Sequence, residues 1–291
     1  MRYLDPKADI LFKKVFGEQK TIVKAFLNAM LPLEEHELIE EIFYETPEMS
    51  SLTPDHKYSI VDVHCTDVSG RHFVVEMQQI WSSEFTSRVV FNSCKAYVRQ
   101  AGKGFRYSNL KPVYSLNLMN QNFLPEEKGF YHHYKIVHKE HTEEVIKGLE
   151  YIFIELPKFR PQDYNTKKMQ VLWLRFLTEI DENTRNISED MLAIPEIRRA
   201  IETVEESSLN DAERRAYDKY WDSVRNEITL LAGAEEKGEA KGIAKGIAKG
   251  IAIGEAKRNA EIAKRMIAKG LSNTEITDFV DLSEAEIEAL R

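Results

Sequence analysis

The sequence predicts an α/β or α+β core that is followed by a helical extension and a long glycine-repeat tail. Segments with strand composition occur only in the first part of the chain, and after Pro157 the apolar residues follow a helical period. Glycine then recurs at every fourth position from Gly238 to Gly254. The expected parts are a core over 1–160, a helical extension over 161–232, and the glycine-repeat helix with a small helical C-terminal unit over 233–291.

Composition and hydropathy are those of a globular protein. The chain has 291 residues, of which 43% are hydrophobic and 30% are charged, and this balance excludes a disordered chain. It contains no run of eighteen apolar residues and no signal-peptide stretch, so we expect no membrane contact and a cytoplasmic location. The two cysteines, Cys65 and Cys94, are too few for a disulfide framework or for a zinc site made of cysteines alone.

Two helices are predicted at the start of the chain. Asp5 is a favourable N-cap, Pro6 suits the first helical position and Gly17 suits the C-terminal end. The first helix should therefore span 5–17, and a second should follow over 21–30.

A β-hairpin is predicted after these helices. Residues 58–66 and 72–79 have strand composition, and the turn residues from Asp67 to Arg71 separate them. The further elements expected are a helix over 84–102, strands over 112–119 and 149–156, and helices over 166–177, 191–204 and 211–231.

The polar face of this hairpin contains two acids. Because side chains alternate along a strand, Asp62 lies on the polar face of the first strand, and Glu76 and Gln78 lie on that of the second. A three-residue loop that ends at Gly70 would place Asp62 opposite Glu76, with the glycine in the left-handed conformation that such a loop needs. A two-residue loop would instead place Asp62 opposite Met77 and separate the carboxylates. We predict the three-residue loop.

Two carboxylates on neighbouring strands can share a hard cation. Mg²⁺ binds oxygen ligands, usually one or two carboxylates, with water and substrate phosphate completing the shell. Such a cation polarises the phosphate and lowers the pKa of the attacking water. Gln78 could orient that water or complete the metal's shell through its carbonyl oxygen. The alternative is that Asp62, Glu76 and Gln78 only line the solvated face of a hairpin, since short acidic patterns are common.

The spacing from Asp62 to Glu76-Met77-Gln78 resembles the D…ExK signature of the PD-(D/E)XK nuclease superfamily, with glutamine in place of lysine. Over roughly 1–160 the chain is similar to the Rpn family of recombination-promoting nucleases and transposase-like proteins, and its glycine-repeat tail is similar to tails in that family. The matching stretches are DPKADILFKKVFG at the start, VDVHCTD and FVVEMQ in the hairpin, and then Arg88, Tyr97, Gln100, Gly104, Tyr107 and KPV at 111–113.

This resemblance implies a mixed sheet flanked by helices and Mg²⁺-dependent DNA cleavage, with Mn²⁺ as a possible substitute and with Asp62 and Glu76 as metal ligands. Gln78 then occupies the lysine position and offers a dipole where lysine offers a positive charge, which points to weak activity or to strong dependence on the metal. The family pattern also has an acid in the first helix, here Asp9. This acid is either a third, outer carboxylate near the metal or a helix-dipole residue in the first turn.

A local basic segment makes nucleic acid a plausible partner despite the net charge of −8, which disfavours attraction over the whole surface. Residues 84–111 contain six lysines and arginines against the single acid Glu84. The segment predicts a DNA phosphate-binding surface beside the hairpin; the alternative is an ordinary solvated helix face. The residues predicted to contact DNA are Arg88, Lys95, Arg99, Gln100 and Lys103.

The tail is predicted to be a helix that packs against another copy of the chain. Each glycine in a helix costs about 1 kcal/mol relative to alanine, and close helix packing in a homo-oligomer would offset this; a flexible linker is the alternative. Beyond it, Gly270 should end a helix, and capping boxes that begin at Ser272 and Ser283 predict two short helices.

Three functional hypotheses follow. The first is a metal-dependent DNA endonuclease that promotes recombination or is linked to mobile elements. The second, suggested by Gln78, is a DNA-binding or assembly protein on a nuclease fold with weak or no catalysis. In the third, the tail is the functional part and the core is a passive head.

Overall fold

The computed structural model describes residues 2–45, 48–49, 59–60, 62–102, 104–161 and 168–291. The chain forms two compact units, Met1–Arg225 and Asn226–Arg291.

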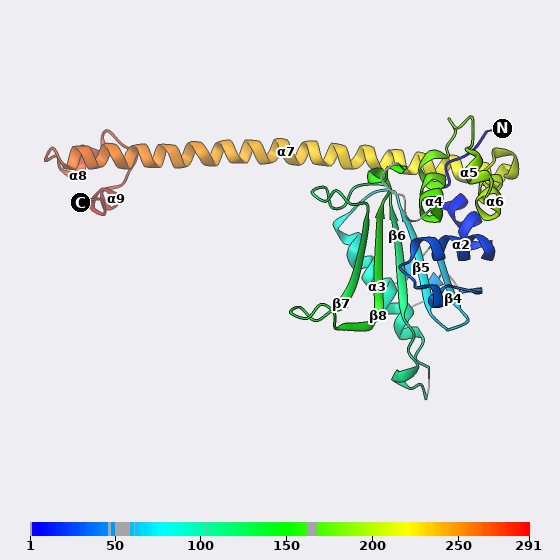
Figure 1. Ribbon diagram of the computed structural model, residues 1–291. Coiled ribbons are helices and arrows are strands. Elements are labelled where there is room, and N and C mark those ends of the chain that lie inside the picture. Colours follow the sequence, from blue (N-terminus) through cyan, green and yellow to red (C-terminus); the bar gives the residue numbers. More distant parts are fainter. Residues whose placement is uncertain (1, 46–47, 50–58, 61, 103, 162–167) are drawn as a thin grey trace. The chain divides into compact units, whose positions relative to one another are not determined.

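The first unit is built on a six-stranded mixed sheet (Figure 1). Its strand order is β1-β4-β5-β6-β8-β7, in which β5, β6 and β8 are parallel and the other pairs are antiparallel. The strands are β1 (Ile42–Tyr44), β4 (Val63–Asp67), β5 (His72–Gln78), β6 (Val113–Met119), β7 (Tyr131–Val137) and β8 (Val145–Glu155), with a separate two-stranded ladder of β2 (Glu48–Met49) and β3 (Ser59–Ile60). This sheet confirms the predicted α/β fold class.

The two edge strands of the sheet were not predicted from the sequence. Strand β1 has only three residues, and the side chains of β7 are half-buried or exposed. Neither strand therefore shows the apolar alternation from which strands are recognised.

Helices cover both faces of this sheet. Helix α3 (Ser83–Arg99) crosses one face (Figure 1), where Val74 and Val113 pack against Ala96. On the other face, the sheet shares one hydrophobic core with six helices. These are α1 (Asp9–Phe12), the π-helix η1 (Lys13–Gly17), α2 (Lys20–Met30), α4 (Lys168–Glu179), α5 (Glu189–Leu192) and α6 (Pro195–Thr203).

Helices α4, α5 and α6 share one hydrophobic core with the sheet. Trp173 of α4 is fully buried and contacts Phe16 and Phe26, with ring centroids 5.9 and 5.6 Å apart. Further along, Tyr217 belongs to the same core. The packing thus divides the chain into two units near Arg225. The three domains expected from the sequence, with boundaries at 160 and 232, stay a prediction.

The predicted start of the first helix was wrong. The helix begins at Asp9 with Ala8 as its N-cap residue. The Asp5 carboxylate instead accepts a hydrogen bond from the backbone N–H of Lys7 at 2.9 Å and pairs with the Lys7 ammonium at 2.9 Å. The aspartate-proline pair therefore forms a turn ahead of the helix.

The predicted hairpin register is confirmed. Strand β4 pairs with β5 so that Val63 lies opposite Val75 and Thr66 lies opposite His72, which leaves a three-residue loop. Gly70 has φ +78°, the left-handed conformation that favours glycine.

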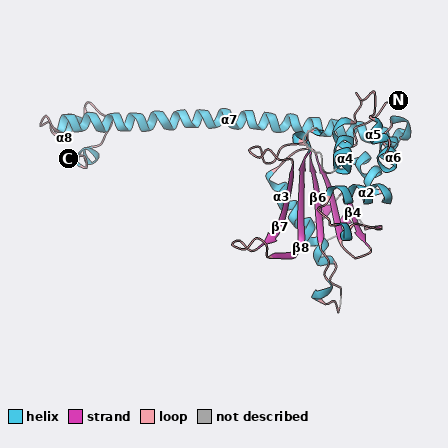
Figure 2. Ribbon diagram, in the orientation of Figure 1, coloured by secondary structure: helices cyan, strands magenta, loops and turns pink. Residues whose placement is uncertain are grey.

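The second unit contains most of helix α7 (Asp211–Ile267), which starts in the first unit and is continuous through the glycine repeat (Figure 2). Short helices α8 (Asn273–Thr277) and α9 (Glu284–Glu288) follow, and both predicted capping boxes are present. Ala263, Ile276 and Ile287 form a small buried core. Among the described helices, none is long and apolar enough to cross a membrane.

Candidate functional site

Three carboxylates meet where α1, the start of β4 and the end of β5 adjoin. Extending the hairpin register by one position places Asp62 opposite Glu76, and the backbone N–H of Met77 donates to Asp62 Oδ2 at 2.7 Å. Asp9 of α1 lies within hydrogen-bonding reach of Asp62. The structure thus brings together three of the four residues predicted to be catalytic.

Burial raises the pKa values of two of these carboxyl groups, Asp62 and Glu76. Loss of hydration raises the pKa of Asp62 to about 6, although the N–H of Met77 opposes the rise. Burial, followed by the nearby Asp62 charge, raises the pKa of Glu76 to about 7. Two adjacent carboxyl groups that hold protons close to neutral pH have a strong electrostatic preference for a cation between them.

Lys13 is a site residue that the sequence reasoning missed. Its Nζ lies 2.6 Å from Asp9 Oδ1 and 3.9 Å from Asp62 Oδ1. Lys13 is also the first residue of the π-helix η1, and π-helical turns occur often at functional sites. The four-residue spacing from Asp9 to Lys13, which suits an ion pair on a helix, was the available signal.

Asn92 was also missed. This side chain is 1% exposed, and its Nδ2 donates to Glu76 Oε1 at 3.0 Å. Its Oδ1 is buried and has no hydrogen-bond partner within the described part of the chain. An amide between Val89 and Ala96 on the apolar stripe of a helix was the sequence signal.

Gln78 has both ends of its amide engaged. Its Nε2 donates to the carbonyl of Ile80 at 2.5 Å, and its Oε1 accepts from Arg88 Nη2 at 2.6 Å. The Arg88 guanidinium also lies over the Phe85 ring, 4.9 Å from its centroid. Gln78 therefore connects β5 to Arg88, and its expected role toward the attacking water stays a prediction.

The other residues predicted to contact DNA lie further along α3 and beyond it. Lys95 lies 5.0 Å from the Phe91 ring centroid, and burial followed by the charge of Arg99 lowers its pKa. Gln100 binds the backbone of Lys111 at both ends of its amide, at 3.0 and 2.8 Å, so it fixes the loop before β6. Lys103 lies outside the described residues.

The donor set of this site suits a hard divalent cation that retains part of its water. No group of three or more His, Cys, Asp or Glu side chains among the described residues is arranged to hold a metal ion. Mg²⁺, however, is commonly bound by one or two carboxylates plus water and substrate phosphate. Asp62 and Glu76 provide two oxygen donors with raised pKa values, and the Asn92 amide, which binds Glu76, holds a buried oxygen without a hydrogen-bond partner among the described residues.

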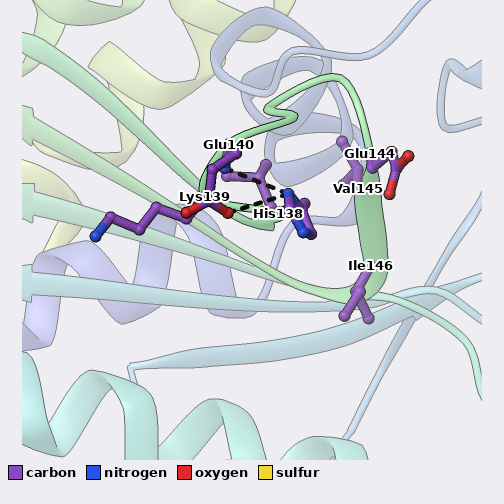
Figure 3. A pocket seen from close by; sticks show the side chains of 7 residues that line it. His138, Lys139, Glu140, Glu144, Val145 and Ile146 are labelled. Carbon is purple, nitrogen blue, oxygen red and sulfur yellow. Dashed lines mark hydrogen bonds and ion pairs between the residues drawn. The ribbon is translucent and has the colours of Figure 1, made fainter.

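A hollow lies away from the carboxylates. It occupies the tip of the β7–β8 hairpin (Figure 3), where His138 Nδ1 accepts from the backbone N–H groups of Glu140 and His141 at 3.3 and 3.1 Å. These bonds fix the turn. Two other histidines, on β7, pair with glutamates of β8: His132 with Glu155 at 2.9 Å and His133 with Glu150 at 2.7 Å.

The comparison with protein families decides the assignment. The model of a PD-(D/E)XK nuclease family transposase matches residues 6–234, which includes the sheet, the carboxylates and the start of α7. The chain belongs to this family. Neither the curated proteins nor the solved structures contain a match to it.

For a PD-(D/E)XK nuclease family transposase, a nuclease-like or transposase-related function is supported, and nucleases of this type typically use divalent metals. The matched region continues past the hairpin into helices α4 to α6. It thus covers the elements that enclose the carboxylates as well as the signature itself.

Proposed function

We propose that this protein is a Mg²⁺-dependent DNA endonuclease that hydrolyses phosphodiester bonds at the site of Asp62 and Glu76. The main support is the pair of facing carboxyl groups, half-buried Asp62 and buried Glu76, whose pKa values are raised to about 6 and about 7. Such a pair is destabilising by itself and is stabilised by a cation.

Each side chain at the site has a distinct role in this proposal. Asp62 and Glu76 hold the cation, whose chemistry is to polarise a phosphate oxygen and to lower the pKa of a water molecule. Asn92 fixes the orientation of Glu76 through its 3.0 Å hydrogen bond. Lys13 partly neutralises Asp9 and Asp62, and Asp9 acts as an outer carboxylate.

DNA is proposed to lie along α3. Arg88, Lys95 and Arg99 fall close to one side of the helix, because positions seven and four residues apart lie within about 40° of each other around a helix. Their charges would neutralise successive phosphates, and such contacts position a duplex without reading its sequence.

The test is cleavage of supercoiled plasmid with Mg²⁺, with Mn²⁺ and with EDTA. We expect metal-dependent nicking by the unmodified protein and its loss in Glu76→Ala. Glu84→Ala is the matched control, since Glu84 is an exposed acid on α3. Cleavage that survives Glu76→Ala would place the activity elsewhere or in a contaminant.

The alternative is a DNA-binding or assembly protein on the same fold, and the observation that favours it is Gln78 in place of a lysine. The Asp62→Ala variant separates the two. An endonuclease loses cleavage and keeps DNA binding in EDTA, whereas a binding protein shows no cleavage to lose with either metal.

Self-association through α7 is a further part of the proposal. Ile243, Ile247 and Ile251 are each more than half exposed, and a Cβ built on Gly246 or Gly250 would meet no atom within 4 Å. A helix with this many glycines needs packing to offset their cost, and a second copy of the helix supplies a matching surface. Sedimentation velocity should show an oligomer that dissociates in a Gly246→Ala, Gly250→Ala variant; an unchanged distribution contradicts the proposal. We further propose that the protein acts in recombination or in mobile elements and that it is located in the cytoplasm.

A further inference from the structure

The position two residues after Glu76 lacks the positive charge that the D…ExK pattern provides there. Gln78 lies on the same face of β5 as Glu76, yet its amide is held at both ends by the Ile80 carbonyl and by Arg88. These two bonds fix the orientation of the Gln78 amide. Its contacts are those of a residue that holds another side chain in place.

The side chain that it holds is a cation. Arg88 is anchored from two directions, by Gln78 Oε1 at 2.6 Å and by the face of the Phe85 ring at 4.9 Å. The residue as a whole remains exposed. A guanidinium carries five N–H donors in a rigid fork, and Gln78 accepts from one of the two Nη atoms. The remaining donors are available to a phosphate.

The charge of Arg88 acts at the carboxylates. Arg88 lowers the pKa of Glu76 through space, and this is the largest of the effects that oppose burial there. The other nearby cation, Lys13, forms its short contact with Asp9, at 2.6 Å. The positive charge of Lys13 is thus largely neutralised by the Asp9 carboxylate. Arg88 is bonded to the neutral amide of Gln78, and this contact leaves its positive charge in place.

We propose that Arg88 supplies the positive charge to the scissile phosphate, and that Gln78 is the positioning residue that aims it. The two side chains, from α3 and β5, together replace the lysine that is absent from position 78. This inference rests on the proposed endonuclease function and adds to it the source of the charge.

The experiment measures kcat and KM for cleavage of a short duplex with Mg²⁺, and DNA affinity in EDTA over a range of salt concentrations. We expect Arg88→Ala to lower kcat about 100-fold, as for the loss of one preorganised donor. The DNA affinity of this variant should fall by a smaller factor than its kcat. The dependence of that affinity on salt concentration should correspond to about one fewer released counterion. Lys128→Ala, which removes an exposed cation outside the proposed DNA-binding surface, is the control and should leave both kcat and DNA affinity unchanged.

Rescue distinguishes positioning from a structural role. Gln78→Ala should lower kcat by about 10-fold or more, because Arg88 loses its anchor while the charge remains. Adding Gln78→Lys to Arg88→Ala should recover at least about 10-fold of the lost kcat, because a lysine at position 78 returns the charge to the same place.

The outcomes separate the inference from the function on which it rests. If Glu76→Ala abolishes cleavage while Arg88→Ala keeps the full kcat, the endonuclease stands and the inference is overturned. The absence of any rescue by Gln78→Lys, or an unchanged salt dependence in Arg88→Ala, also overturns it. If the unmodified protein does not cleave DNA with Mg²⁺ or Mn²⁺, both proposals fail.

Discussion

Neutralising Glu76 should stabilise the metal-free protein at alkaline pH. The folded protein raises the pKa of this group from the ordinary 4.5 to about 7, chiefly through burial. At about 1.36 kcal/mol per pKa unit, the ionised carboxylate destabilises the fold by roughly 3 kcal/mol above pH 7. Glu76→Gln removes this charge and keeps an oxygen that can accept from Asn92. We therefore expect a gain of up to about 3 kcal/mol at pH 8.

The pH dependence has a definite sign. Between pH 4.5 and 7 the folded protein binds a proton at Glu76 that the unfolded chain has released, so stability decreases as pH rises through this window. Below pH 4.5 the group is protonated in both states. The difference between Glu76→Gln and the unmodified protein should accordingly be below about 1 kcal/mol at pH 5 and largest above pH 7.

The assay is urea denaturation in EDTA, followed by tryptophan fluorescence at pH 5 and pH 8. All three tryptophans, Trp81, Trp173 and Trp221, lie in the first unit, so the signal reports only the unit that contains the site. Glu84→Gln is the control for an exposed glutamate. A Glu76→Gln variant that is no more stable than the unmodified protein at pH 8 would refute the reasoning.

Three further predictions concern the metal, the missed amide and the hairpin loop. Mg²⁺ should raise the melting temperature of the first unit above pH 7 but little at pH 5, because Asp62 and Glu76 must release protons before they bind the cation. Scanning calorimetry of the unmodified protein and of Asp62→Asn tests this. Equal stabilisation by Mg²⁺ at both pH values would contradict it. Asn92→Ala should lower the single-turnover cleavage rate about 10- to 100-fold, because Glu76 loses its fixed orientation; an unchanged rate argues against that role. Gly70→Ala should destabilise the first unit by about 1–2 kcal/mol, since φ is +78° and the new Cβ would lie 3.3 Å from Lys111 Cγ; an unchanged urea midpoint would show that the loop adapts.

Much of the fold followed from local patterns in the sequence. The hairpin register depended on a three-residue loop ending in glycine, and that loop fixes which residues face each other across the strands. The capping boxes at Ser272 and Ser283 placed the two short C-terminal helices. At Asp5 the N-cap prediction was wrong, because this residue forms a turn ahead of a helix that begins at Asp9.

The surroundings of the site were less predictable. Lys13 and Asn92 lie 49 positions before and 30 positions after Asp62 in the sequence, and each meets its carboxylate only because η1 and α3 pack at the hairpin. Tyr220 is a third example: the charges of Asp9 and Asp62 contribute to its raised pKa, although burial is the main cause. Contacts of this kind depend on packing between distant segments.

The sequence by itself determined the family, the α/β class and the pairing of Asp62 with Glu76, because these depend on short-range alternation, turn chemistry and a spaced motif. Only the tertiary structure decided that burial raises the pKa values of those carboxyl groups and that Gln78 holds Arg88. Desolvation and side-chain hydrogen bonding depend on the atoms that surround a group, and most of those atoms come from helices remote in the chain.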